Sequence, residues 1–107
     1  MNFLEIKDNI EAILSRQQIQ SQLLELHYLA YLFGSGFVAY RINGVNFRFA
    51  YDGRDGILTI DKTKMHEKYS QGNWEVIFEG KLPESLEDFQ HLVLSLTPLN
   101  SENVSQK

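Results

Sequence analysis

The sequence contains no cysteine, which excludes disulfide bonds, thiolate metal ligands and cysteine nucleophiles. No apolar run approaches the length needed to cross a bilayer. The first residues also lack the basic segment and the continuous apolar core of a secretory signal peptide. We therefore expect a cytoplasmic chain without a membrane partner, since a chain without cysteine fits a reducing compartment.

Positive charge is also scarce. Lysine and arginine number 10 against 14 aspartates and glutamates, which gives a formal net charge of −4. Phosphate backbones bind basic surfaces, so we expect no nucleic-acid partner. The length of 107 residues fits one domain. We expect a single α+β domain over residues 1–98 and a polar, frayed tail over residues 99–107.

Signatures of catalysis and of metal binding are absent from the sequence. It contains no nucleophile elbow, no phosphate-binding loop and no dinucleotide fingerprint. The histidines fall in different predicted elements, and only Glu87 and His91 have the spacing of neighbours on a helix. Such a pair is more often a solvated contact than a site. We predict no metal, no cofactor and no catalytic residue, which favours a non-enzyme.

The strongest local signal is the pair Asn43 and Gly44 between two alternating runs, which predicts a two-residue hairpin turn of type I′. This turn sets the pairing of the two strands: Ile42 opposite Val45, Tyr40 opposite Phe47, and Val38 opposite Phe49. Side chains alternate along a strand, so these six residues share one face.

A third strand is predicted after a four-residue loop over 52–55. In that register Phe49 lies opposite Leu58, and Phe47 lies opposite Ile60. Both turns then place the large apolar side chains on the same side of the sheet, which predicts the face that packs against the helices.

The opposite face of these strands carries a different set of side chains. The predicted rows are Arg41 with Asn46 and Asp61, then Ala39 with Arg48 and Thr59, then Phe37 with Ala50 and Ile57. One interpretation is a half-solvated sheet with a weak Arg41–Asp61 pair. The other is a recognition surface of two guanidiniums beside an apolar patch, with Arg41, Arg48, Phe37, Ile57 and Asp61 as its candidate binding residues.

Residues 3–33 contain no glycine or proline and show apolar residues at helical spacing, which predicts one kinked helix or two consecutive helices. We favour two, with a break at 15–18, where the Ser-x-x-Gln pattern is typical of a capping box. The second helix would be apolar on nearly all sides. We therefore expect a homodimer that buries Leu29 and Leu32.

The second half of the chain predicts two more elements. Residues 62–73 form either a mobile loop or one short helix that ends at Gly72. A fourth strand follows over 74–79, with Trp74, Val76 and Phe78 facing inward. The last helix has Pro83 in its first turn and ends at Pro98, and its buried stripe is Leu86, Phe89, Leu92, Val93 and Leu96.

These elements predict a two-layer α+β fold. A four-stranded antiparallel meander would be packed on its Tyr40/Phe47 face by the N-terminal helix or helices and by the C-terminal helix. The order of helix, sheet and helix is similar to that of type III secretion chaperones and frataxin-like proteins. No motif of either family matches residue by residue, so no residue role is transferred.

The function that we expect is that of a small non-catalytic protein-binding module, such as an inhibitor, an immunity-type protein, a chaperone or a regulator. A second candidate surface for a basic partner is formed by the acidic residues Glu75, Glu79, Glu84, Glu87 and Asp88. The alternative is a small-ligand-binding protein or enzyme with a pocket between sheet and helices. Its walls would be Tyr28, Tyr31, Tyr40 and Phe47.

Overall fold

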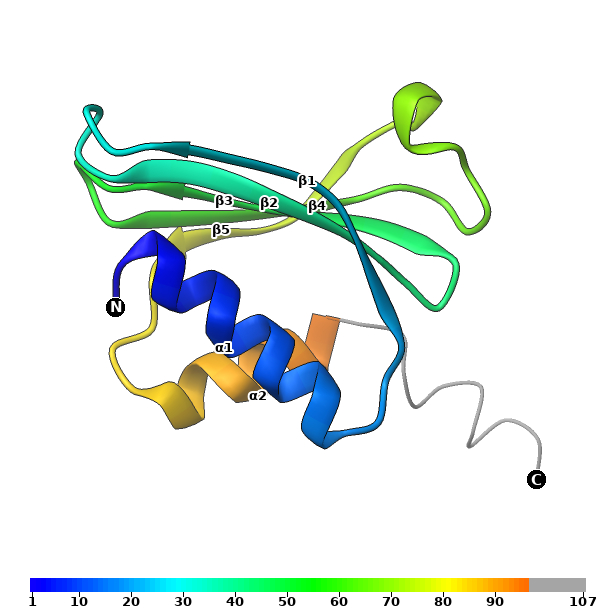
Figure 1. The fold of residues 1–107 in the computed structure, drawn as a ribbon, viewed down its shortest axis with the longest axis horizontal. Coiled ribbons are helices and arrows are strands. Elements are labelled where there is room, and N and C mark those ends of the chain that lie inside the picture. Colours follow the sequence, from blue (N-terminus) through cyan, green and yellow to red (C-terminus); the bar gives the residue numbers. More distant parts are fainter. Residues whose placement is uncertain (97–107) are drawn as a thin grey trace.

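A computed structural model describes residues 1–96 (Figure 1). Its elements are α1 (Phe3–Arg16), β1 (Ser21–Leu29), β2 (Ser35–Ile42), β3 (Val45–Asp52), β4 (Ile57–Lys62), the 3₁₀ turn η1 (Tyr69–Gln71), β5 (Glu75–Lys81) and α2 (Leu86–Leu96). The strands form one antiparallel sheet in the order β1-β2-β3-β4-β5. The α+β class and the meander are confirmed, but the sheet has five strands and not four.

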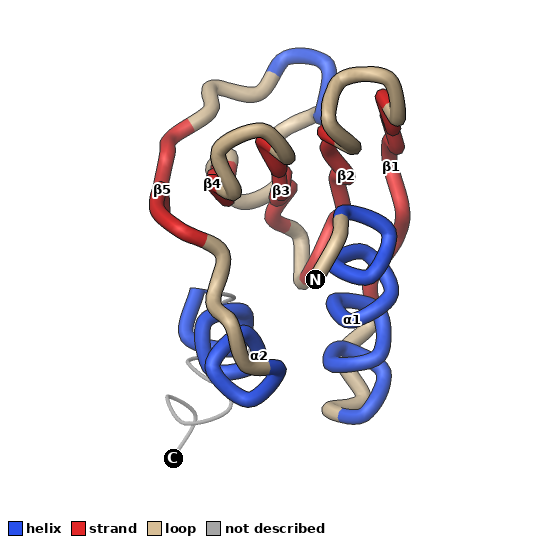
Figure 2. The backbone as a smooth tube through the Cα atoms, turned by 90° about the vertical axis from the view of Figure 1, so that its left-hand side faces the viewer, coloured by secondary structure: helices blue, strands red, loops and turns tan. Residues whose placement is uncertain are grey.

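Both helices lie on one face of the sheet. Figure 2 shows α1 beneath β1 and β2, and α2 beneath β5 at the other edge. The arrangement is therefore two layers, with one face of the sheet turned away from both helices (Figure 1).

The N-terminal prediction was half wrong, because only the first of the two expected helices exists. Asn2 caps α1: its side chain accepts a hydrogen bond from the Glu5 amide, and the Glu5 carboxylate accepts one from the Asn2 amide. The helix then ends at Arg16, and Gln18 turns the chain with a φ of 57°. The segment 15–18 thus terminates a helix and starts none.

Residues 21–29 form a strand because β2 offers them an open edge on which to pair. A short apolar run fits a strand as well as a helix, so hydrophobic spacing alone did not separate the two structures. In this segment the pairing partner decides the secondary structure.

The β2–β3 hairpin is confirmed in register. Ile42 pairs with Val45, Tyr40 with Phe47, and Val38 with Phe49. Asn43 and Gly44 both have positive φ, at 52° and 83°, as a type I′ turn requires.

The β3–β4 register differs by two residues from the prediction, because the loop occupies 53–56 rather than 52–55. Phe49 therefore pairs with Ile60, and Arg48 pairs with Asp61. A shift of two preserves the face of every side chain, so the predicted apolar face survives while the predicted neighbours change.

The last strand departs from its predicted alternation. A bulge between Ile60 and Asp61 of the β4–β5 pair shifts the register, and Ile77 and Phe78 both pack against the core. Val76 is 55% exposed, so its predicted inward position is wrong. Between β4 and β5, the predicted short helix exists as η1, with Gly72 as its C-cap.

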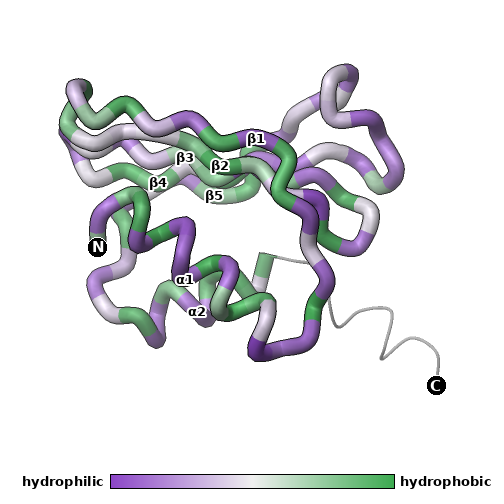
Figure 3. Tube along the Cα trace, viewed as in Figure 1, coloured by the Kyte–Doolittle hydropathy of each residue, from purple (hydrophilic) through white to green (hydrophobic). Residues whose placement is uncertain are grey.

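One hydrophobic core lies between the sheet and the helices. Its fully buried side chains include Ile6 and Ile10 of α1, Tyr40 and Phe47 of the sheet, and Phe89 of α2. In Figure 3 the connection between β4 and β5 is mostly hydrophilic, in contrast to the strands.

The C-terminal helix α2 buries Phe89 and Val93 as predicted, but Leu86 is half exposed at its first turn. Pro98 and the predicted tail over 99–107 lie outside the described residues.

Candidate binding face of the sheet

The face of the sheet turned away from the helices is called the open face here. It is built by alternate residues of the five strands: Glu25 and His27 of β1, Phe37, Ala39 and Arg41 of β2, Asn46, Arg48 and Ala50 of β3, Ile57, Thr59 and Asp61 of β4, and Glu79 of β5. The hairpin pattern placed Phe37, Arg41 and Arg48 correctly relative to one another, while Ile57 and Asp61 of β4 lie on the same face but two residues away from their predicted rows. The connection between β4 and β5 rises above one end of this face (Figure 1).

Arg48 is held in place by two partners from that side of the molecule. Its Nη2 atom donates to Oδ2 of Asp61 at 3.1 Å, and its Cζ atom lies 4.2 Å from the ring centroid of Trp74. The Trp74 ring in turn meets the edge of Tyr69, with 5.6 Å between the centroids. We call Arg48, Asp61, Tyr69 and Trp74 the clasp. The predicted Arg41–Asp61 pair is wrong, because Asp61 pairs with Arg48.

A second set of contacts fixes the same connection through its backbone. Asn46 is fully buried and donates from its side-chain amide to the Glu67 carbonyl at 2.9 Å. Arg41 donates from Nε to the side-chain oxygen of Asn46 at 2.9 Å. A buried amide with these partners is satisfied, so this end of the open face is structurally closed. Arg41 and Arg48 are therefore braces within the chain rather than two unengaged guanidiniums.

Tyr69 also ties the clasp to the edge strand β1. Its hydroxyl donates a hydrogen bond to the Glu25 carboxylate, which also contacts the His27 ring at 2.8 Å. The Tyr69 hydrogen bond, followed by that of His27, lowers the pKa of Glu25. Burial, followed by the bond to Glu25, raises the pKa of Tyr69 to about 12. The open face is thus crossed by a polar network from β1 to β5.

The other end of the open face is uncovered and apolar. A groove of about 330 Å³ lies there, lined by Leu29, Ser35, Gly36, Phe37, Ala50, Tyr51, Asp52, Ile57 and Thr59. The His27 ring stacks on Phe37 with 4.8 Å between the centroids, which fixes one wall. We call this hollow the apolar groove. It contains two of the predicted binding residues, Phe37 and Ile57.

The border of the apolar groove is acidic. Asp52 lines the groove itself, and Glu79 lies directly opposite Thr59 on β5. Lys81 lies directly opposite Ile57 of the groove and donates to the backbone carbonyl of Asp55 at 2.9 Å. The predicted acidic residues Glu75, Glu79, Glu84, Glu87 and Asp88 are all exposed, but those of α2 lie on the helix side of the sheet (Figure 2). The border of the groove therefore carries two carboxylates and one ammonium group, a small excess of negative charge.

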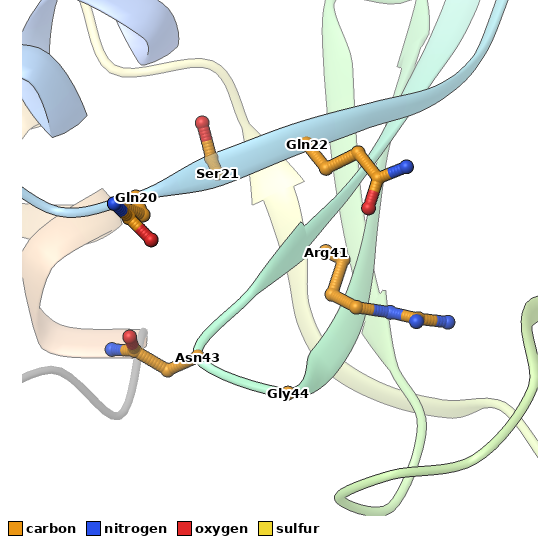
Figure 4. Close-up of a pocket in the computed structure, with 6 residues that line it drawn as sticks. All are labelled: Gln20, Ser21, Gln22, Arg41, Asn43 and Gly44. Carbon is orange, nitrogen blue, oxygen red and sulfur yellow. The ribbon is translucent and has the colours of Figure 1, made fainter.

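A polar hollow lies near the β2–β3 turn. It measures about 280 Å³ and is lined by Gln20, Ser21, Gln22, Arg41, Asn43 and Gly44 (Figure 4). Arg41 points along this hollow from β2, and the two glutamines come from the start of β1. Its lining offers hydrogen-bond donors and acceptors and no carboxylate.

The predicted tyrosine pocket between sheet and helices is wrong. Tyr40 and Phe47 are fully buried in the core, where the Tyr40 hydroxyl donates to Glu11 of α1 at 2.7 Å. Tyr31 is 80% exposed in the turn between β1 and β2, and Tyr28 stacks on Phe3. These side chains therefore do not converge on one cavity.

The predicted dimer residues belong to one turn, in which the Leu32 amide donates to the Leu29 carbonyl at 2.9 Å, but they lie in different surroundings. Leu29 lines the apolar groove at the end of β1, while Leu32 is 44% exposed in the following turn. Sequence reasoning missed Tyr69 and Trp74 as residues of the open face. Two aromatic side chains in an otherwise polar connection were the available signal, since such side chains usually find a surface to cover.

Among residues 1–96, no three His, Cys, Asp or Glu side chains gather in a way that would hold a metal ion. In the same part of the chain, neither helix has the length and apolar character needed to span a membrane. The chain matches no protein-family model, and comparisons with curated proteins and with solved structures find no match either.

Proposed function

We propose that this chain is a small non-catalytic protein-binding module whose partner docks on the open face of the sheet. The observation that carries the proposal is that both helices cover one side of the sheet (Figure 2), which leaves the apolar groove on the other side accessible. The occupant that fits is a segment of another protein with one large apolar side chain.

Rigidity supports binding at this face. Phe37, Ala50 and Ile57 stand on paired strands, and His27 packs against Phe37. Side chains that are already fixed lose little conformational entropy when a partner arrives. An apolar anchor that enters a preformed hollow is the usual centre of a protein interface.

Charge supports a basic partner. Asp52 lines the groove, and Glu79 lies opposite Thr59 at its border. A partner with lysine or arginine beside its apolar anchor would associate faster and in one orientation. Of the acidic surface predicted as a separate candidate, Glu79 lies on this face, whereas Glu87 and Asp88 belong to α2 on the helix side of the sheet (Figure 2).

The test uses the full chain, tagged and recovered from its native host to obtain the partner, followed by titration calorimetry with purified proteins. The substitution Ile57→Lys places a long cation in the groove and is expected to weaken binding by at least about tenfold, or 1.4 kcal/mol. Val76→Lys makes a similar change on the exposed part of β5, outside the groove, and is expected to bind nearly as the parent does.

Two results separate the candidate surfaces. If folded Ile57→Lys binds like the parent while Val76→Lys fails, the partner uses the acidic β5 edge and the groove proposal is wrong. The double variant Arg41→Ala/Arg48→Ala is expected to bind more weakly than the parent, because it loosens the Arg48–Asp61 contact between β3 and β4, the strands that carry Ala50 and Ile57 of the groove. Circular dichroism spectra serve as the folding control for all three variants.

The alternative function is small-ligand binding, and the polar hollow near the β2–β3 turn favours it (Figure 4). Arg41 together with Gln20 and Gln22 suits a small ligand with carboxylate or phosphate oxygens. A thermal-shift screen of such anions would test it, with Arg41→Ala expected to abolish any stabilisation and Arg54→Ala to leave it unchanged.

A further inference from the structure

β1 is an edge strand with an unpaired outer side. Among residues 1–96 it pairs with β2 only, so the backbone amides and carbonyls that point away from β2 have no strand partner in that part of the chain. The segment Ser21–Leu29 contains no proline, lysine or arginine, which are the residues that usually protect such an edge. Three of its apolar side chains are strongly exposed: Leu23 at 48%, Leu26 at 42% and Tyr28 at 45%.

We propose that β1 pairs antiparallel with β1 of a second copy of this chain, around a two-fold axis that passes midway between the two Leu26 residues. The two five-stranded sheets would then join into one continuous sheet of ten strands. This inference is independent of the partner proposed for the apolar groove, because the axis is perpendicular to the sheet and leaves both open faces accessible.

The charges on β1 select the register. When two identical strands pair antiparallel around a two-fold axis perpendicular to the sheet, one residue lies directly opposite its own copy. The side chains of these two copies point to the same face of the sheet. Centring on Glu25 brings two carboxylates together, and centring on His27 brings two imidazoles together. Centring on Leu26 places Glu25 opposite His27 of the second copy, twice, so each carboxylate faces an imidazole and no two carboxylates meet. Like charges directly opposite each other destabilise pairing.

The apolar side chains agree with the same register. Leu26, which is 42% exposed, lies opposite Leu26 of the second copy. Leu26 and Tyr28 pair with Val38 and Gly36 of β2, which places them on the helix side of the sheet, where Phe3 already stacks on Tyr28. Pairing therefore buries exposed apolar surface on the helix side of the sheet and places each carboxylate beside an imidazole on the other side.

The other edge of the sheet makes a contrast. β5 carries Glu75 and Glu79, both exposed, and antiparallel pairing with its own copy would bring carboxylates close together. The bulge between Leu23 and Glu25 limits regular pairing of β1 to its second half, which is the half that contains Leu26.

The first test is the mass of the protein in solution, measured by sedimentation equilibrium over a range of concentrations up to about 100 µM. The parent chain is expected to be dimeric at the upper end. Leu26→Lys places two cations opposite each other and is expected to raise the dimer dissociation constant at least about tenfold. Val76→Lys puts the same charge on the other edge and is expected to leave the dimer intact. A monomeric parent, or a dimer lost with Val76→Lys and kept with Leu26→Lys, would overturn the proposal.

The second test reads the register directly and does not depend on the stability of a charged variant. Because the chain has no cysteine, a single substitution introduces the sole thiol. Residues directly opposite in an antiparallel pair have the separation that a disulfide needs. Leu26→Cys is expected to form a linked dimer under mild oxidation at least about ten times faster than Glu25→Cys or His27→Cys. Equal or faster linkage of either neighbour would exclude the Leu26-centred pairing.

Discussion

Arg48 of β3 and Trp74, the residue before β5, lie face to face, with 4.2 Å between the guanidinium carbon and the centroid of the indole ring. The same guanidinium is paired with Asp61. The sequence suggested that Arg48 is a free recognition group. In the structure, its side chain instead contacts Trp74 and holds the β4–β5 connection against the sheet.

Arg48→Ala is expected to lower the free energy of unfolding by about 1–2 kcal/mol, since it removes a partly buried ion pair and a cation–π contact together. Trp74 is the sole tryptophan, so its fluorescence reports on the clasp. The native emission should shift toward that of a solvated indole. The matched control Arg54→Ala lies in the exposed β3–β4 loop and should change neither quantity. Identical emission from parent and Arg48→Ala would show that the clasp does not depend on Arg48.

Phe47→Ala is expected to lower the free energy of unfolding by about 3–5 kcal/mol, because it empties a fully buried aromatic site in the centre of the core. The same substitution at Phe33, which is 69% exposed in the β1–β2 turn, is expected to cost less than about 1 kcal/mol. Denaturant melts of both variants test this. Equal losses would mean that the face of β3 has been assigned incorrectly.

Gly53→Ala is expected to destabilise the fold by about 1–3 kcal/mol through overpacking. A methyl group there would lie 1.9 Å from the Phe33 carbonyl oxygen, so the tips of the β1–β2 and β3–β4 connections would have to separate. At Gly80 the nearest atom would be 3.4 Å away, on the Phe78 ring, so Gly80→Ala is the control and should change stability by less than about 1 kcal/mol. Thermal melts that rank the two variants in the reverse order would contradict this close approach.

Alkaline pH is expected to weaken the fold through Tyr69. The pKa of this hydroxyl is raised to about 12, above the unfolded value of 10.0. A raised pKa stabilises the fold fully below the unfolded value, and that contribution is lost as the pH rises through the folded value. Stability measured by denaturant titration should therefore fall less steeply in Tyr69→Phe than in the parent between about pH 10 and pH 12. Parallel curves would show that the bond to Glu25 contributes nothing, because the other buried tyrosine, Tyr40, is common to both proteins.

Much of the sheet could be predicted because its signals are local. Asn43 and Gly44 determine a turn type, the turn determines the register, and the register determines which side chains meet the helices. The loop after Asp52 offers no such unique turn, so its position was predicted one residue too early and the β3–β4 pairing moved by two. β1 was misassigned because its conformation depends on the free edge of β2, which is a tertiary influence without a local signature.

The residues of the open face could be predicted from the sequence, but which of them are covered by other parts of the chain could not. Alternation along the strands was enough to place Phe37, Arg41 and Arg48 on one side. What covers the arginines depends on a connection that folds back over the sheet, and its course is determined by the buried amide of Asn46 and by the Arg48–Trp74 contact. Long-range contacts of this kind leave no periodic pattern in a sequence, so the two ends of the face could not be distinguished.

The meander also determines how the chain can fold as it is synthesised. Every strand pairs with its neighbour in sequence, so the sheet closes only short loops and can form progressively from β1 to β5. The helix α2 is the last described element to leave the ribosome, and it supplies Phe89 and Val93 to the core. Until then the apolar side of β4 and β5 has no helix over it, which makes the nascent sheet prone to aggregation. A chain truncated after Lys81 would remain in that state permanently, so the arrival of the final helix ends the aggregation-prone stage as well as stabilising the finished fold.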